Sequence, residues 1–188
     1  MAAPQPGILM EESAHALYLV LRARRGASRR ALIKACAQAP ELTASMTRRH
    51  PKAALRCTVA FGRRLLADGE GWPKPPVRLA ELKPIHSKAG DVPRTPADVM
   101  FHIGSARHDV NFALAQELVA AVGDKAEVVE DVTGFRFLDT RDLTGFIDGT
   151  ANPKGRERSE AGLIGAEDRT FAGGSYVLIQ RFVHDLEA

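Results

Sequence analysis

The chain has 188 residues, of which 45% are apolar and 26% are charged, and its formal net charge is +3. This length allows one ordinary domain, or one and a fraction, with a sizeable apolar core, and the composition is typical of soluble globular proteins. No apolar run approaches the roughly 20 residues of a membrane-spanning helix, so no membrane partner is expected.

Charge is spread unevenly along the chain. Residues 1–64 hold 12 Lys or Arg against 3 acids (net +9), whereas residues 65–188 hold 14 against 20 (net −6). A basic half can indicate nucleic-acid binding. However, Arg29, Arg30 and Lys34 fall on the expected solvent face of a helix, and no aromatic residues interleave with them. We therefore expect a solvated face and no nucleic-acid partner, with a basic nucleic-acid module as the weaker alternative.

The first predicted elements are a strand and a helix. Residues 15–23 (HALYLVLRA) are rich in strand-forming residues and apolar on both faces, as a central strand should be. Ser28 is predicted to cap a helix whose apolar residues follow at helical spacing. Pro40 should end or kink that helix, and a second helical piece is expected over residues 41–49.

The next predicted elements are a strand and a long loop. Apolar residues occupy every second position of residues 54–61, which indicates a strand. Residues 62–96 contain six prolines and the only tryptophan, Trp72, without any periodicity. Such a length without regular structure predicts a functional or covering loop.

Three further elements complete a recognisable order. Residues 98–105 alternate as a strand, residues 107–122 have a helical pattern closed by Gly123, and residues 127–138 indicate a fourth strand. The order is therefore β-α-β-β-α-β. This order predicts an α+β fold of the ferredoxin-like type, with an antiparallel sheet and helices on one face.

The end of the chain carries another strand signal. Residues 174–184 (GSYVLIQRFVH) alternate in the manner of a strand, but nothing after them could complete a sheet. An unpaired apolar edge is an aggregation hazard, so this strand is expected to need a partner.

A short motif around Asp148 carries the main chemical signal. In residues 145–153 (GFIDGTANP) this carboxylate lies between a short apolar run and a turn. Gly149 lets backbone or a flat ligand approach closely, and Asn152-Pro153 then turns the chain away. The motif suits a proton-handling group beside a bound cofactor. The alternative is a surface turn in which Asp148 hydrogen-bonds its own backbone.

The sequence of this motif resembles the GxxDG signature of the dye-decolorizing peroxidases, a family of bacterial and fungal haem enzymes. Four further segments are similar to its cytoplasmic bacterial branch and occur in the same order: RHDVNF at 107–112, GFR at 134–136, RDLTG at 141–145, and GGSYV at 173–177 followed by Gln180-Arg181. The resemblance extends from about Gly7 to the last residue.

The resemblance implies a fold of two ferredoxin-like units in one chain, related to dimeric α+β barrels. Residues 1–140 would form the N-terminal ferredoxin-like domain, and residues 141–172 a connecting segment with the GxxDG motif. Residues 173–188 would be the first strand of a second, truncated unit. The chain is thus expected to correspond to the N-terminal half of a family member.

The resemblance also implies a chemistry. Asp148 would be the acid–base on the distal side of a haem b that reacts with hydrogen peroxide, and Gly149, Thr150 and Ala151 would line the haem edge. Dyes, phenols or other one-electron donors would be the reductants. The proximal histidine ligand of the iron and a distal arginine are expected beyond Ala188, so no metal ligand is assigned within the chain; His184 matches a different family position.

The expected location is the cytoplasm. Residues 1–12 show neither the basic nor the apolar region of a secretory signal, and Cys36 and Cys57 do not suggest a disulfide framework. The resemblance adds a homo-oligomer for the full-length protein. The alternative to an enzyme is an inactive or non-catalytic ferredoxin-like fragment that associates through its orphan strand.

Overall fold

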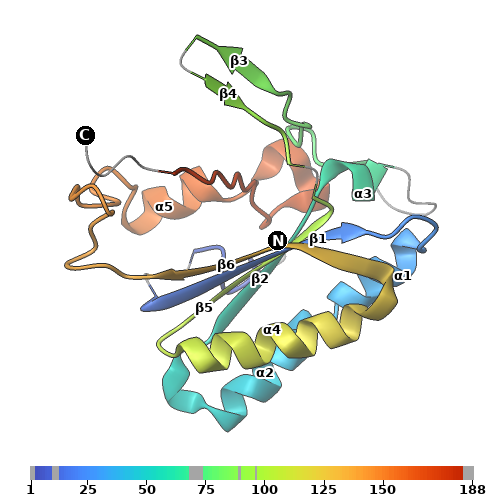
Figure 1. The fold of residues 1–188 in the computed structure, drawn as a ribbon, viewed down its shortest axis with the longest axis horizontal. Coiled ribbons are helices and arrows are strands. Elements are labelled where there is room, and N and C mark those ends of the chain that lie inside the picture. The colour runs from blue at the N-terminus through green and yellow to red at the C-terminus, as the bar shows by residue number, and fades with distance from the viewer. Residues whose placement is uncertain (1–2, 10–12, 68–73, 89, 96, 184–188) are drawn as a thin grey trace.

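The computed structural model describes residues 3–9, 13–67, 74–88, 90–95 and 97–183. Its centre is a four-stranded antiparallel sheet in the order β2-β5-β1-β6, with helices α1, α2 and α4 on one face (Figure 1). The elements of this unit are β1 (His15–Ala23), α1 (Arg29–Cys36), α2 (Ala39–Arg49), β2 (Arg56–Phe61), β5 (Val99–Ser105), α4 (His108–Val122) and β6 (Ala126–Phe135). This is the ferredoxin-like arrangement, and the predicted fold class is confirmed.

Local sequence signals explain where the helices begin and end. The Ser28 hydroxyl accepts a hydrogen bond from the Ala31 amide (3.3 Å), as expected for the N-cap of α1. Pro40 lies in the first turn of α2, where its missing N–H has no helical partner to lose. The proline therefore begins the second helix instead of ending the first, which stops earlier at Cys36.

The core lies between the sheet and its helices. Alternate residues of the two central strands point into it, Leu17, Leu19 and Leu21 from β1 and Phe101 and Ile103 from β5. They meet apolar side chains from all three helices, which include Leu32, Ile33, Met46, Leu114 and Leu118. Burial of each such side chain contributes about 1.5–3 kcal/mol, and this packing fixes which face of every strand turns away from the helices.

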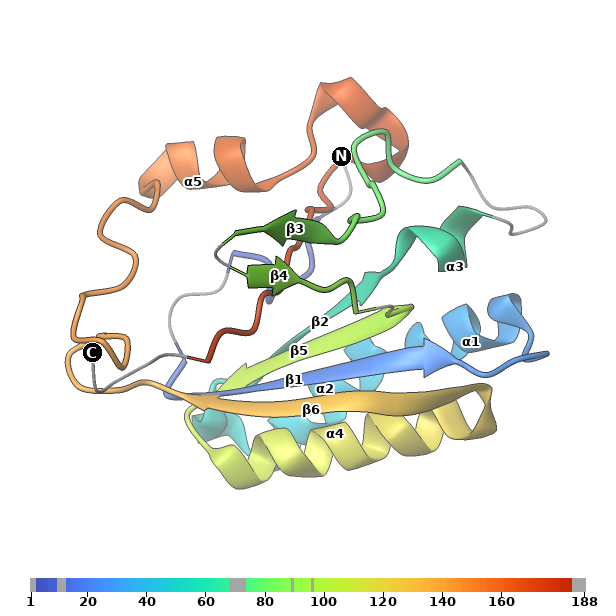
Figure 2. The same cartoon turned by 45° about the horizontal axis from the view of Figure 1, so that its top comes forward.

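The opposite face of the sheet is covered by the chain that follows β6. Helix α5 (Gly155–Gly162) and the residues after it lie on the side of the sheet away from α4 (Figures 1 and 2). Residues 162–164 are tied to residues 173–175, because the Ile164 amide donates to the Gly174 carbonyl (2.8 Å) and the Ser175 hydroxyl donates to the Gly162 carbonyl (2.6 Å). This segment creates a second, more open layer.

The predicted loop at residues 62–96 contains short regular elements. They are helix α3 (Arg63–Ala67) and a hairpin of β3 (Ile85–Ser87) and β4 (Gly90–Val92) that projects from the body (Figure 1). An ion pair between Arg94 and Glu81 (2.8 Å) closes the base of the hairpin. Trp72 lies outside the described residues. Elements this short give no periodic signal, so the sequence could not indicate them.

The strand predicted over residues 174–184 is wrong for the residues that the structure describes. Residues 174–183 have no strand structure, and His184 lies outside the described residues. Strand propensity becomes a strand only where a neighbour completes the backbone hydrogen bonds, and no strand of the described chain lies in register with this segment. Its apolar side chains stay exposed, among them Leu178 and Phe182. The division of the chain at residues 140 and 172 stays a prediction.

Within the described ranges, no helix combines the length and the apolar character that crossing a membrane requires.

Candidate functional site

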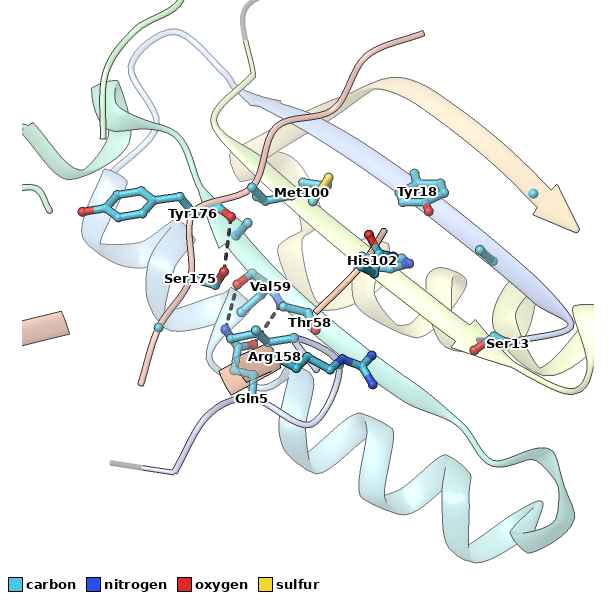
Figure 3. A pocket seen from close by; sticks show the side chains of 18 of the residues that line it. Gln5, Ser13, Tyr18, Thr58, Val59, Met100, His102, Arg158, Ser175 and Tyr176 are labelled. Carbon is cyan, nitrogen blue, oxygen red and sulfur yellow. Dashed lines mark hydrogen bonds between the residues drawn. The ribbon is translucent and has the colours of Figure 1, made fainter. Parts of the chain in front are cut away.

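A large pocket lies between the helix-free face of the sheet and the covering segment. Its volume is about 1290 Å³. The floor comes from β1, β2 and β5 and one wall from the N-terminal residues (Figure 3). The other walls come from residues 134–177 and from Leu66, Pro76 and Leu79. Such a volume exceeds the roughly 300–1,000 Å³ of most small-molecule sites, so the pocket is large enough for a bulky ligand.

Two stacked rings form the centre of the floor. Tyr18 of β1 and His102 of β5 are paired in register, with ring centroids 4.5 Å apart and an interplanar angle of 11° (Figure 3). Met100 lies two residues along β5 on the same face. Burial lowers the pKa of His102, since desolvation disfavours the charged imidazolium. The floor therefore presents two flat rings to the pocket, and the His102 ring is neutral at neutral pH.

This burial predicts a pH-dependent stability. The folded pKa of His102 is lowered below the unfolded value of about 6.5, so the unfolded chain binds the proton more readily. The contribution of His102 to the free energy of unfolding is fully present above the unfolded pKa. It is lost as the pH falls through the unfolded pKa toward the folded pKa. We expect the urea midpoint to fall more between about pH 7.5 and pH 5.5 in the wild type than in His102→Phe, which keeps the stack.

A matched control is His86→Phe, because His86 is exposed on the hairpin beside Asp91. This variant should keep the wild-type fall in the urea midpoint. Equal falls in His102→Phe and the wild type would contradict the prediction.

The N-terminal segment forms the wall beside β2. The side-chain amide of Gln5 accepts from the Val59 amide (2.9 Å) and donates to the Val59 carbonyl (3.0 Å), as a neighbouring strand would (Figure 3). A Cβ at Gly7 would lie 2.0 Å from the Thr58 hydroxyl, so only glycine fits there. The Thr58 hydroxyl oxygen is buried in the pocket lining and has no hydrogen-bond partner among the described residues.

Asp148 lies among the residues that line the pocket, within a hydrogen-bonded turn. Its amide donates to the Thr140 carbonyl (2.9 Å), and Arg141 and Ile147 pair as an isolated antiparallel bridge. Asp148 is exposed and, with Gly149 and Asn152, lines the pocket. The carboxylate that accepts backbone hydrogen bonds in this turn is that of Asp142.

Gly149 is held in a conformation that requires glycine. Its φ is +75°, and a Cβ would lie 3.0 Å from the side-chain nitrogen of Asn152. Thr150 and Ala151 are exposed in the same turn but do not belong to the pocket lining. Of the four predicted site residues, the structure thus brings Asp148 and Gly149 to the pocket and leaves the other two beside it.

Sequence reasoning missed the floor and the basic rim. The rim consists of Arg136, Arg141, Lys154 and Arg158; among the described residues that line the pocket, the one acid is Asp148. The strand alternation did place His102 opposite the core residues Phe101 and Ile103, and this was the available signal for the floor. Nothing local in the sequence relates residues 5–9 or residues 154–158 to it.

The pocket chemistry favours a planar ligand with negative groups at its edge. Flat rings and apolar side chains make the floor, and cations that can bind carboxylates make the rim. Across the described parts of the chain, no cluster of three or more His, Cys, Asp or Glu side chains is placed to hold a metal ion.

Comparison with known proteins agrees with this arrangement. The family described as "Dyp-type peroxidase, N-terminal" matches residues 5–136, and "Dyp-type peroxidase, C-terminal" matches residues 139–188. A dye-decolorizing peroxidase of Rhodococcus erythropolis is 35% identical over 190 residues, which cover 98% of this chain and 53% of the relative. One from Mycobacterium tuberculosis is 47% identical over 112 residues, 58% of this chain and 33% of the relative.

Solved structures show the same likeness. A variant of Rhodococcus jostii RHA1 DypB in complex with heme superposes with a TM-score of 0.81 at 36% identity, over 91% of this chain and 55% of that one. The encapsulated DyP-type peroxidase from Mycobacterium smegmatis gives 0.84 at 33% identity, over 92% and 55%. The match covers about half the length of two of the curated relatives, 53% and 51%, and about a third of two others, 33% and 36%.

Proposed function

Because the chain belongs to the Dyp-type peroxidase family, we propose that it provides the distal side of a haem-dependent peroxidase. Hydrogen peroxide would be the oxidant, and dyes, phenols or other one-electron donors the reductants. The observation that carries the proposal is the position of Asp148: this residue of the GxxDG motif lines a large pocket, while the Asp142 carboxylate accepts the hydrogen bonds of the turn.

The residues present fit a haem. The Lys154 and Arg158 cations in the lining can bind its propionates through charge-assisted hydrogen bonds. Gly149 keeps the wall free of a side chain next to Asp148, and we propose that it lines the haem edge with Thr150 and Ala151 beside it.

Asp148 is proposed as the acid–base group. A bound haem b would supply the iron at which peroxide is reduced. The Asp148 carboxylate would accept a proton from one oxygen of the peroxide and return it to the oxygen that leaves as water. This is general acid–base catalysis, and it requires the carboxylate to be held within hydrogen-bond reach of the peroxide.

The axial ligand of the iron is not assigned to a histidine that the structure describes. His102 lines the pocket, but its ring stacks on Tyr18 at 4.5 Å within the sheet face. We propose, from the family resemblance, that the proximal histidine and a distal arginine lie outside residues 1–188.

The cellular setting is proposed on the same basis. We propose a cytoplasmic enzyme that is a homo-oligomer at full length and has neither membrane nor nucleic-acid partners. Support comes from Cys36, which is buried, and Cys57, which is partly buried; both are free thiols, as suits a reducing compartment.

Haemin titration in the presence and absence of imidazole tests the haem site. Imidazole supplies an axial nitrogen, so saturable one-to-one binding, followed in the Soret band, is expected with imidazole and weaker binding without it. Gly149→Ala should weaken the binding, because its Cβ meets Asn152 at a φ of +75°. Gly155→Ala is the matched control, since Gly155 also has positive φ (+53°) but has open space around it.

Absence of saturable binding under both conditions would contradict the haem site. A second candidate would then gain weight, the association of a non-catalytic chain through residues 174–183. The observation in its favour is the exposure of apolar side chains there, including Val177, Leu178 and Phe182. A compact dimer in size-exclusion chromatography, together with failed haemin binding, would support this candidate.

A further inference from the structure

The turn before Asp148 is organised by one carboxylate, that of Asp142. A single oxygen, Oδ1, accepts hydrogen bonds from the Thr144 amide (2.8 Å), the Thr144 hydroxyl (2.6 Å) and the Phe146 amide (3.1 Å). The backbone of Asp142 closes the same turn, because its amide donates to the Phe146 carbonyl (2.9 Å) and its carbonyl accepts from the Gly145 amide (3.1 Å). Five hydrogen bonds thus converge on one residue.

This closure sets the register of the residues that follow. Once the chain has reversed over residues 142–146, Ile147 lies opposite Arg141 as an antiparallel bridge. The next amide, that of Asp148, then reaches the Thr140 carbonyl at 2.9 Å. Arg141 reinforces the turn from outside, since its Nη1 donates to the Gly145 carbonyl (2.7 Å). The position of Asp148 therefore depends on how the turn closes.

Apolar packing does not explain the order of this turn. Leu143 and Phe146, the large apolar residues within it, are 55% and 75% exposed. Hydrogen bonds from the Thr144 side chain, and then from backbone amides, hold the pKa of the Asp142 carboxyl below its usual value. Asp142 therefore stays ionised at neutral pH, and its Oδ1 oxygen is free to accept from all three donors.

We propose that Asp142 is the positioning residue for Asp148: by accepting three hydrogen bonds at one oxygen, it holds the turn that delivers the Asp148 carboxylate to the pocket. Asp142 touches neither haem nor peroxide in this proposal. The part of the inference that concerns catalysis rests on the proposed role of Asp148, whereas the part that concerns position does not.

The test of position uses backbone NMR of the 188-residue chain without haem. Asp142→Ala removes the acceptor and the charge, whereas Asp142→Asn removes only the charge and keeps the acceptor oxygen. The reporter resonances are the amides of Asp148 and Gly149, which make no direct contact with the substituted side chain. We expect them to move toward random-coil positions in Asp142→Ala and to stay near the wild type in Asp142→Asn. Asp139→Ala, at an exposed carboxylate of the same segment, is the control and should leave them unchanged.

The test of catalysis uses the full-length, haem-loaded protein and measures the rate of its reaction with peroxide. Misplacement of a catalytic group by about 1 Å can lower a rate on the order of 100-fold. We therefore expect the rate to fall about 10- to 100-fold in Asp142→Ala and to stay within about three-fold of the wild type in Asp142→Asn.

Unmoved Asp148 and Gly149 resonances in Asp142→Ala would overturn the inference, and so would an Asn variant as disordered as the Ala variant. If Asp148→Asn leaves the peroxide reaction unchanged, the proposed function fails, but the resonances still decide the role of Asp142.

Discussion

Replacement of Asp148 by Asn in the full-length, haem-loaded protein is expected to slow its reaction with peroxide by about 10²- to 10⁴-fold, the usual contribution of a positioned acid–base group. Asn keeps the size and a hydrogen-bonding oxygen of the side chain but cannot take up and return a proton. Haem content should stay at the wild-type level, because the pocket floor and basic rim are untouched. Stopped-flow absorbance in the Soret region measures the rate after mixing with peroxide.

The matched control for this experiment is Asp139→Asn. Asp139 is an exposed carboxylate of the same segment, and it does not line the pocket. Asp139→Asn removes one negative charge from the same segment, as Asp148→Asn does. If the loss of charge alone slowed the reaction with peroxide, both variants would be slow. A wild-type rate in Asp148→Asn would disprove the acid–base role. A loss of haem from this variant would instead indicate that Asp148 helps to hold the cofactor.

The sheet could be predicted because its signals are local and agree with one another. The strand of residues 15–23 has the predicted bounds, and apolar residues at alternate positions of residues 98–105 face the core. The helix after Arg107 begins one residue later than predicted, at His108, and ends at Val122 before Gly123 as predicted. Once the element order is known, the ferredoxin-like topology leaves few alternatives for the sheet.

The candidate site was only half predictable, because its parts come from distant segments. Asp148 and Gly149 could be predicted as site residues because consecutive residues of one motif form their turn. The Tyr18–His102 stack depends on the register between β1 and β5, and the wall at Gln5 depends on a contact across 54 residues of chain. No sequence window contains either relation. Asp142 was missed for another reason: both acids follow turn signals, and only the structure shows which one bonds the backbone.

The segment after residue 173 shows that strand propensity alone does not determine whether a strand forms. Its alternation predicted a strand, yet residues 174–183 lie without strand pairing in the described chain. Apart from backbone hydrogen bonds at Gly174, its contacts come from side chains. Examples are the hydrogen bond from the Arg78 amide to the Tyr176 hydroxyl (3.1 Å) and the ion pair of Arg181 with Glu130 (3.1 Å). Strand formation needs a neighbour, and the sequence of the segment itself does not specify one.

Phe101→Ala is expected to lower the free energy of unfolding by about 3–5 kcal/mol, the usual cost of truncating a buried phenylalanine. Phe101 is fully buried (0% exposed) in β5, a central strand that pairs with β1 on one side and β2 on the other, and its ring packs in the core cluster. Its removal leaves a cavity that neighbours on two strands and the helices cannot all fill. Urea unfolding measures the loss.

Phe112→Ala is the matched control, because Phe112 is 51% exposed on α4 and should cost much less. An equal loss in both variants would mean that the core does not lie where the strand alternation places it.

The same two variants also test the pocket. His102 follows Phe101 directly and faces the other way, so the packing of Phe101 fixes the direction of the ring that stacks on Tyr18. Phe101→Ala should therefore also weaken haemin binding in the presence of imidazole, whereas Phe112→Ala should leave this binding unchanged. Unaltered binding in a folded Phe101→Ala variant would show that the pocket does not depend on the packing of Phe101.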